Sequence, residues 1–397
     1  MSEFTFNATA RIDAVYNYSK DLIIGVNGVD ALNKYSEILQ KVTPKDIIIA
    51  FDYLVKDNYK MNDIKRTVSK VLNILHKVII SYPAIKSEEN SFINILEKNN
   101  LILDNYLKEI KLNIRKINKE NPDNELKEIL INQIIELQKF ENHYIIKENI
   151  LFPFIEKEFS EYRCLQIMWS IHDEIRRNLK LIILCLKNEI FDLKEFNHLV
   201  GRVFFDMYAI KYREEKLIFP VISESLDLNK LNLHINQAIE IGFPYYTPNV
   251  KFHNKQNYNN LPIELIDLKT GILTVNQIIS IFNHLPVDIT FVDENDEVKY
   301  FSSPKERFFA RSTVIIGRKI QNCHPKESVH IVNKIIDEFR NGTKNEATFW
   351  IKIKGRFLYI QYFPVRDVDN KYLGTIEVSQ NISKISELKG ERRLLDW

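Results

Sequence analysis

Two related segments, about 67 residues apart, constrain this chain more than any other feature. The first runs from His143 to Pro153 and the second from Ile210 to Pro220. Each carries a glutamate and an apolar pair and ends in Phe-Pro, and the proline bends or ends the helix that the rest of the segment forms. Because helical sequence lies between the two copies, the repeat predicts the two halves of a four-helix bundle.

Apolar spacing around the repeat predicts long helices with short connections, as in an up-down-up-down bundle over residues 86–228. Asn121-Pro-Asp-Asn124 separates the first two helices, and Asp192 is placed to cap the last one. The helices are expected near residues 88–117, 123–153, 161–189 and 192–225.

These motifs resemble the hemerythrin-type HHE cation-binding domain. That family places a His on its first helix, His-x3-Glu before Phe-Pro on its second and fourth helices, and a His near Ile-Arg on its third. The i, i+4 spacing sets two ligands on one helix face, and carboxylates then bridge two irons. The resemblance implies iron as the metal. The matching positions are His143, Glu148, His172 and Glu214.

About half of the ligand positions depart from the family pattern. Lys147 stands four residues after His143, where the family pattern has Glu, and Ile210 stands where the family has the His of the fourth helix. The first helix has no His, and Asn99 or Asn100 occupies the corresponding place. The remaining groups are too few for a diiron centre and marginal for one ion. A bundle with no metal or a single weakly held ion, and a functional non-heme iron site, are the two alternatives.

Lys147 suggests how the bundle could do without a metal. Lys147 and Glu214 are equivalent positions, each six residues before the proline of its copy. Where a metal-holding homologue has two carboxylates across the cations, an ammonium could pair directly with the remaining carboxylate. We hypothesise a buried Lys147–Glu214 ion pair that takes the place of the metal. Its expected hydrogen-bond partners are His143, His172, Tyr144, Tyr208 and Tyr212.

Residues 1–85 read as a small helical domain of unknown function. Thr43 is expected to cap a helix that begins at Pro44, and a later helix carries several basic residues from Lys65 to Lys77. Two helices joined by a short turn could form a DNA-binding helix-turn-helix, but basic helix faces are usually solvated and the net charge is only +2. We predict an interaction domain with no nucleic-acid partner. Isolated His76 and His198 are expected to be hydrogen-bonded core residues.

Beyond a connector at residues 229–282, the pattern changes to short alternating strands. Strands are expected at 289–293, 298–301, 346–352, 356–363 and 374–380, with helical runs at 303–311 and 327–341. This order resembles a PAS sensor domain over residues 283–384. Residues 385–397 resemble its exit helix, a common dimerisation element.

PAS domains hold ligands between the sheet and the central helices, and one cluster there could carry chemistry. Cys323, His324 or His330 could ligate a heme iron. The alternative is that His324 and Pro325 only start a helix, with a side chain capping it. No flavin-attaching motif is evident, because Cys323 is the only cysteine of this domain.

The fold class is therefore expected to be multidomain and mainly α, with a C-terminal α+β PAS domain. Three cysteines without CxxC spacing favour free thiols in a reducing compartment. Arg11 and Asp13 lie where a signal peptide needs its apolar core, and no apolar run approaches the ~20 residues of a membrane span. We expect a cytoplasmic protein.

The order of domains resembles a bacterial family of three-part cytosolic proteins. The resemblance implies a non-enzymatic sensor or regulator that detects oxygen, nitric oxide, redox state or a small ligand. Its partner would be another protein or a second copy of this chain, with self-association through the PAS domain and exit helix. The alternative function is a non-heme iron protein that binds oxygen or nitric oxide or supplies iron for cluster repair.

Overall fold

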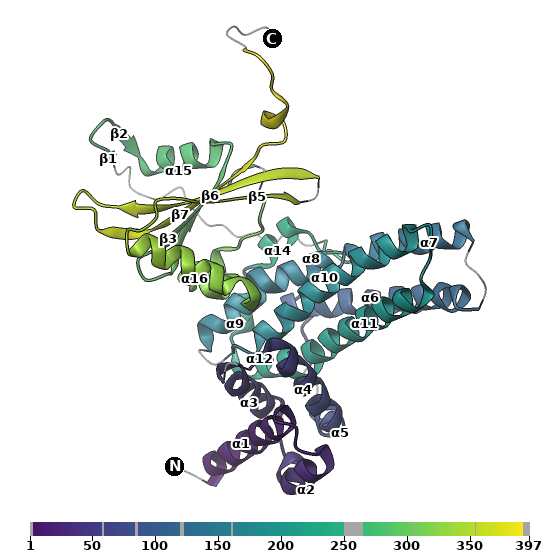
Figure 1. The fold of residues 1–397 in the computed structure, drawn as a ribbon. Coiled ribbons are helices and arrows are strands. Elements are labelled where there is room, and N and C mark those ends of the chain that lie inside the picture. Colours follow the sequence, from purple (N-terminus) through teal and green to yellow (C-terminus); the bar gives the residue numbers. More distant parts are fainter. Residues whose placement is uncertain are drawn as a thin grey trace. The chain divides into compact units, whose positions relative to one another are not determined.

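The computed structural model describes residues 3–57, 59–83, 86–119, 123–159, 162–249, 265–305, 307–353 and 355–391. The chain forms two compact units, Met1–Asn254 and Lys255–Trp397. The first unit is helical and the second contains a five-stranded sheet (Figure 1). The expected change from a mainly helical region to a C-terminal α+β region is confirmed.

The first unit begins with short helices, as expected. They are α1 (Glu3–Ile23), α2 (Gly28–Leu39), α3 (Pro44–Lys56), α4 (Met61–Ile74) and α5 (His76–Ser81). The predicted cap of α3 is confirmed: Thr43 Oγ1 accepts from the Asp46 N–H, while the Asp46 carboxylate accepts from the Thr43 N–H. This reciprocal pair starts α3 at Pro44 and thereby fixes the turn after α2.

The basic residues of α4 do not form one free face. Lys65 is buried, and its Nζ donates to Ser170 Oγ at 3.1 Å and to Glu174 Oε1 at 2.5 Å on the helix α10 (Leu165–Lys187). This contact ties α4 to the longer helices that follow. His76 does bond a neighbour, Tyr212, but the expected core placement of His76 and His198 was wrong, because both are exposed.

Long helical segments make up the rest of this unit, close to the predicted ranges. Asp192 caps α11 as predicted, because its carboxylate accepts from the N–H groups of Lys194 and Glu195. Helix α10 packs against α7 and α11, and α6 packs against α7. The segments are α6 (Phe92–Ile117), α7 (Asn124–Gln138), α8 (Glu141–Ile146), α9 (Phe152–Glu158), α10, α11 (Leu193–Arg213) and α12 (Phe219–Ser225).

Each Phe-Pro motif follows a π-helical turn, η1 (Lys147–Leu151) or η2 (Glu214–Ile218). Proline lacks the N–H that would continue the α-helical pattern. In both copies the preceding Phe N–H instead donates to the carbonyl five residues earlier, that of Lys147 or Glu214. The wider turn lets consecutive side chains face inward, so that Lys147 and Glu148 are both buried.

Two short helices lie in the region expected to be an irregular connector. Helices α13 (Leu228–Asn232) and α14 (Ile235–Ile241) bury Leu231, Ile235 and Ala238. Residues 242–249 form the expected loop, whereas the expected loop at 254–260 lies outside the described residues. The second unit then begins with a hairpin of β1 (Leu265–Asp267) and β2 (Ile272–Thr274), followed by α15 (Val275–His284).

The sheet of the second unit has the antiparallel order β4-β3-β7-β6-β5. Its strands match the predicted ones: β3 (Asp288–Asp293), β4 (Val298–Phe301), β5 (Ala347–Ile353), β6 (Arg356–Arg366) and β7 (Tyr372–Asn381). Gly374 permits a close approach of β7 to β3, since an added Cβ would lie 2.1 Å from the Val292 carbonyl oxygen. Helix α16 (Lys326–Arg340) packs against β6 and β7.

The helical run expected at 303–311 was wrong. Its described residues contain no helix, and a short 3₁₀ turn follows at Thr313–Ile315. Side-chain bonds hold this stretch in an irregular path: the Phe308 N–H donates to Asp288 Oδ2 at 2.9 Å, and Arg307 donates to the Ser302 carbonyl. These tertiary bonds replace the local bonds that a helix would have made.

The exit helix is also not found in the residues that can be described. Ile385–Glu387 form one 3₁₀ turn, and residues 388–391 are not helical. Gly390 has a φ of 68°, a left-handed conformation that is incompatible with a continuing α-helix. Leu388 is 77% exposed. Without buried apolar contacts, so short a segment gains little from helix formation. Residues 392–397 lie outside the described part of the chain.

The described cysteines Cys164, Cys185 and Cys323 form no disulfide, in agreement with the expectation from their spacing. Across the described ranges, no helix combines the length and apolar character that crossing a bilayer requires.

Candidate functional site

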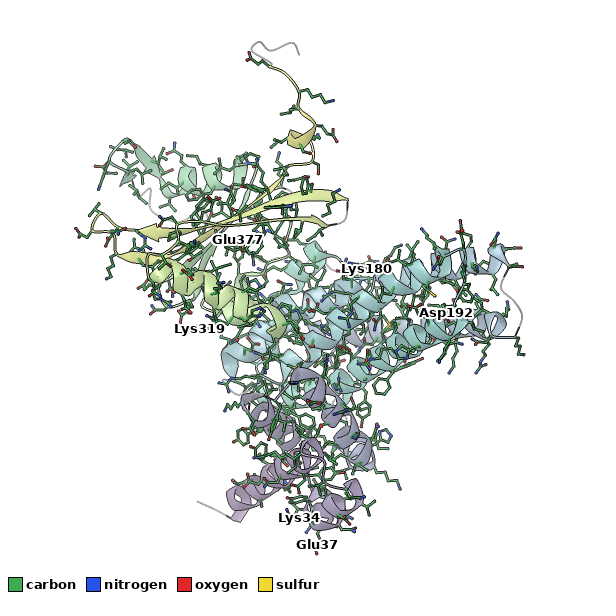
Figure 2. The ribbon with its side chains drawn as sticks, in the orientation of Figure 1. Lys34, Glu37, Lys180, Asp192, Lys319 and Glu377 are labelled. Carbon is green, nitrogen blue, oxygen red and sulfur yellow. The ribbon has the colours of Figure 1, made fainter. Side chains whose placement is uncertain are left out.

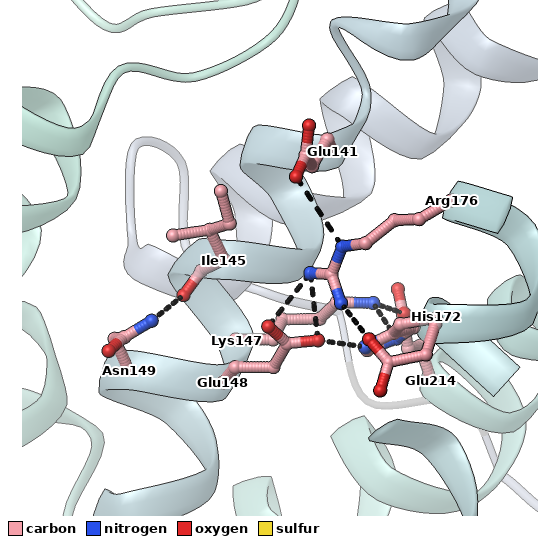
Figure 3. Close-up of polar contacts among 9 residues, drawn as sticks. Glu141, Ile145, Lys147, Glu148, Asn149, His172, Arg176 and Glu214 are labelled. Carbon is pink, nitrogen blue, oxygen red and sulfur yellow. Dashed lines mark hydrogen bonds and ion pairs between the residues drawn. The ribbon is translucent and has the colours of Figure 1, made fainter. Parts of the chain in front are cut away.

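The polar residues singled out in the helical region meet in one buried cluster. Figure 3 shows four of them: Lys147, Glu148, His172 and Glu214. His143, Lys147 and His172 are fully buried, and Glu214 is 1% exposed. Glu148 lies beside them, also buried. The two π-helical turns supply Lys147, Glu148 and Glu214, so the repeat in the sequence corresponds to a meeting point in space.

Lys147 lies between the glutamate and a histidine. Its Nζ donates to Glu214 Oε1 and lies 3.3 Å from His172 Nε2. His143 Nε2 lies 3.2 Å from the other carboxylate oxygen, Glu214 Oε2. Of the tyrosines named above, Tyr144 joins the cluster, since the ammonium lies 4.8 Å from its ring centroid. The structure therefore brings the two hypothesised ion-pair partners into direct contact.

The other two tyrosines lie elsewhere. Tyr212 Oη is 3.1 Å from His76 Nδ1, and Tyr208 is exposed. His172 is instead held by stacking on Tyr144, with ring centroids 4.2 Å apart and planes 13° apart. This stack fixes the imidazole that faces Lys147.

Asn100 is the residue of α6 that contacts Glu214. Its Nδ2 donates to Glu214 Oε2 at 2.9 Å. Asn99 faces a different partner, and its Oδ1 accepts from the Tyr245 and Tyr246 N–H groups. The structure thus decides between the two asparagines that the sequence left open, and Asn100 completes the shell around Glu214.

Glu148 forms a second carboxylate centre with Arg176, a residue whose role the sequence reasoning missed. Arg176 Nη2 donates to Glu148 Oε1 at 3.0 Å and to Oε2 at 2.8 Å, and His172 Nδ1 lies 2.8 Å from Oε1. The spacing His172–Arg176 was the available signal, because residues four apart share a helix face. Each carboxylate therefore has its own cation.

The surroundings set the protonation states of this cluster. Burial, reinforced by the nearby Lys147 charge, lowers the pKa of His143 to about 4 and lowers the pKa of His172 well below its usual range. For Glu214, burial alone would raise the pKa, but Lys147 and His143 together lower it well below the usual range. At neutral pH both imidazoles are neutral and the Glu214 carboxylate is ionised.

This arrangement does not fit a metal ion. Among the residues that the structure describes, no group of three or more His, Cys, Asp or Glu could hold one. The Lys147 ammonium lies where Glu214 and His172 converge, and the other nitrogen of His172 faces Glu148. The donors that the family resemblance assigns to iron are turned toward protein cations. That the ion pair replaces a metal stays a prediction.

A second candidate site lies inside the C-terminal unit, a cavity of about 380 Å³. Strands β3, β5, β6 and β7 form one wall, and α16 with the 3₁₀ turn Ile320–Cys323 forms the other. Most of the lining is apolar. It comprises Val292, Ile320, Ile331, Val332, Ile335, Ile336, Phe349, Ile351 and Ile360, with polar residues Thr290, His324, Ser328, Tyr362, Thr375 and Glu377.

The polar residues of the cavity centre on Glu377 (labelled in Figure 2). Arg311 Nη2 donates to Glu377 Oε1 at 3.1 Å. Burial lowers the pKa of His324, and burial together with the Glu377 charge raises the pKa of Tyr362 well above its usual range. The cavity therefore offers a neutral imidazole, a neutral phenol and one paired carboxylate against an apolar wall.

Of the heme candidates, His324 alone lines this cavity. Cys323 packs against the core around Ile315 and Ile336, and His330 is exposed on α16. The alternative is met in part: α16 does begin directly after His324 and Pro325, at Lys326, but no side chain makes a capping hydrogen bond at this described helix start. Sequence reasoning missed Tyr362 and Glu377, although the two-residue alternation along β6 and β7 was the available signal.

The C-terminal segment matches a known family model. Residues 278–383 match the family described as "PAS domain". This part of the chain is a PAS domain, as the strand pattern predicted.

Several solved structures are similar to the same part. The C-terminal domain of a Streptococcus mutans protein is 31% identical, covering 32% of this chain and 98% of that one, with a TM-score of 0.31. The PAS domain of a Colwellia psychrerythraea protein is 18% identical. The match covers 28% of this chain and 97% of that one, with a TM-score of 0.23. A sensory box sensor histidine kinase from Vibrio cholerae is 11% identical. The match covers 27% of this chain and 89% of that one, with a TM-score of 0.21. The comparison with curated proteins gives no match.

Proposed function

We propose that this protein is a non-enzymatic signal sensor whose PAS domain binds a compact small molecule. The observation that carries the proposal is the cavity of about 380 Å³, apolar over most of its wall and polar around Glu377. Ligand pockets of about 300–1,000 Å³ usually combine an apolar lining with a few polar groups that orient the ligand. The match of residues 278–383 to the PAS domain family supports a sensory role.

The size and the polar groups of the cavity limit the class of ligand that it can bind. A volume near the lower end of that range suits a body the size of one or two rings. Because Arg311 already pairs with Glu377, the polar end favours a hydrogen-bond donor over a second anion. Among the options expected from the sequence, we therefore select a small organic ligand over heme.

We further propose that residues 86–228 are an HHE-like four-helix bundle in which the Lys147–Glu214 ion pair has replaced the metal. The contact between these two side chains supports it, as does Asn100 in place of a histidine. A partner protein, or a second copy of this chain, would receive the signal at the PAS domain. The edge strand β5 exposes Trp350 (66%), the kind of aromatic residue that protein interfaces favour.

Filling the PAS cavity is expected to abolish ligand binding. Val332 lines the cavity, so Val332→Phe removes space, whereas Val368→Phe adds the same volume at a position that is 90% exposed. Indole, an apolar ring with one N–H donor, serves as the probe in thermal-shift and calorimetric titrations. We expect indole to stabilise the parent and Val368→Phe but to bind Val332→Phe at least about tenfold more weakly. Equal binding to all three proteins would contradict the proposal.

Metal and heme analysis tests the alternative function. Protein purified aerobically and anaerobically is expected to contain far less than one iron per chain, because protein cations already satisfy Glu214 and Glu148. Expression with added hemin is expected to give no Soret band. Two irons per chain with a charge-transfer band would instead establish a non-heme iron protein.

A further inference from the structure

Arg213, the last residue of α11, is a buried cation that the cluster in Figure 3 does not use. Its side chain is 5% exposed, and its Nη2 donates to Ser69 Oγ of α4 at 3.2 Å. Burial lowers the pKa of its guanidinium to about 10, so that it remains charged at neutral pH. A charged guanidinium has therefore been taken out of water.

The guanidinium lacks a counter-ion in the described part of the chain. Its Nε and Nη1 atoms have no hydrogen-bond partner there, and no carboxylate lies within ion-pair distance. Asp206, whose charge acts on it, is bonded to Arg202, with Nε and Oδ2 3.2 Å apart. Buried charges are normally paired, since an unpaired one is costly. Two N–H donors of this buried cation are thus left without a protein acceptor in the described residues.

Arg213 also lines a pocket of the first unit. Helices α4, α5 and α11 and the turn η2 enclose about 490 Å³, with Arg213 in the wall. Leu72, Ile80 and Phe205 provide apolar surface, and the ring of Tyr212 lies beside that of His76, with centroids 5.5 Å apart. All of these elements belong to the first unit.

The charge of this pocket is positive. Lys211 is already paired with Asp104 at 2.6 Å and Glu215 at 3.5 Å. Arg213 and Lys216 also line the pocket, and neither has an ion-pair partner within the described ranges. With Lys211 paired to carboxylates, the charges of Arg213 and Lys216 remain without a partner among the described residues. The planar guanidinium of Arg213 suits an acceptor with two oxygens, such as a carboxylate or phosphate.

We propose that this pocket binds a small organic anion, whose carboxylate or phosphate oxygens pair with the Arg213 guanidinium while its apolar or aromatic body lies against Leu72, Ile80 and Phe205. The site is separate from the PAS cavity, and it lies at the junction of the N-terminal helices with the longer ones. Occupancy would join α4 and α5 to α11 through the ligand. This gives residues 1–85 a role in ligand binding.

Three probes separate the requirements of the site. Phenyl phosphate has both an oxyanion and an aromatic body, inorganic phosphate has only the oxyanion, and phenol has only the body. In buffer without other oxyanions, the full chain is titrated with each probe by calorimetry and thermal shift. We expect saturable binding of phenyl phosphate, about tenfold weaker binding of inorganic phosphate, and no stabilisation by phenol.

Variants then assign the binding to Arg213. Arg213→Met is expected to bind phenyl phosphate at least tenfold more weakly and, because it removes an unpaired buried charge, to melt no lower than the parent without ligand. Lys216→Gln, at a half-buried position, is expected to weaken binding several-fold without affecting folding. Arg177→Met removes an exposed guanidinium from α10 and is expected to bind like the parent.

Each other outcome overturns the proposal. Absence of saturable binding to the parent would do so, as would equal binding by Arg213→Met. An equal loss in Arg177→Met would show attraction to general positive charge only. Should Arg213→Met fail to fold, unchanged binding by Lys216→Gln would overturn it. The PAS cavity variants test the proposed function separately, because Val332→Phe leaves this pocket unaltered.

Discussion

Replacing Lys147 by methionine is expected to lower the free energy of unfolding by about 3–5 kcal/mol. Lys147 is fully buried, and its ammonium is the protein cation in contact with Glu214. The variant would leave a carboxylate that is 1% exposed with only Asn100 and a neutral His143 beside it. A buried charge that loses its counter-ion carries its desolvation cost uncompensated.

A double-mutant cycle separates this effect from simple loss of packing. Glu214→Gln alone should also destabilise, because it strands the ammonium, whereas Lys147→Met with Glu214→Gln should recover much of the stability. Lys180→Met is the matched control, since Lys180 is exposed on α10 (Figure 2) and should change stability by less than about 0.5 kcal/mol. The measurement is urea unfolding followed by helical circular dichroism. Unaltered stability of Lys147→Met would refute the proposed ion pair.

The second large effect is expected on acidification, where the helical unit should lose stability from about pH 6.5 downward. His143 has a folded-state pKa of about 4, compared with 6.5 when solvated. Between these values the unfolded chain binds a proton that the native state refuses, so the free energy of unfolding falls as pH falls. The loss from His143 alone is about 3 kcal/mol across this window.

The neighbours of His143 act in the same direction. The pKa of His172 is also lowered, by burial and by Lys147, so its protonation adds to the same loss. Below about pH 4.5 the Glu214 carboxylate, whose native pKa is lowered, contributes a further loss. Glu148 and Arg176 face His172 from the other side as an ion pair.

Urea unfolding at a series of pH values measures this dependence directly. The slope of the unfolding free energy against pH should be positive between pH 4 and 6.5, and His143→Gln should reduce it by up to one proton. A flat profile across this window in the parent would contradict the native-state neutrality of His143.

The sequence was informative wherever the relevant forces act over a few residues. The cap at Thr43, the cap at Asp192, the ends of the long helices and the five strands of the sheet all follow from capping groups and local periodicity. Apolar spacing fails where tertiary bonds replace local ones, as at Phe308, and where nothing packs on an apolar segment, as at Leu388.

The equivalence of Lys147 and Glu214 could also be read from the sequence, because each precedes a Phe-Pro by the same number of residues. The sequence could not show which other side chains contact Lys147 and Glu214. The π-helical turns shift the helical register, so that neighbouring residues such as Lys147 and Glu148 both point inward, and a period of 3.6 residues cannot predict that.

The sequence by itself determined that a mainly helical region precedes a C-terminal PAS domain, and which residues depart from a metal-binding pattern. Only the tertiary structure decided that Asn100 and not Asn99 meets Glu214, that His324 alone of its cluster lines the PAS cavity, and that Arg213 lies buried without a counter-ion. The reason is physical. Helix and strand signals arise from neighbours in the chain, whereas a buried polar group is defined by partners that can lie more than a hundred residues away and meet it only when the helices pack.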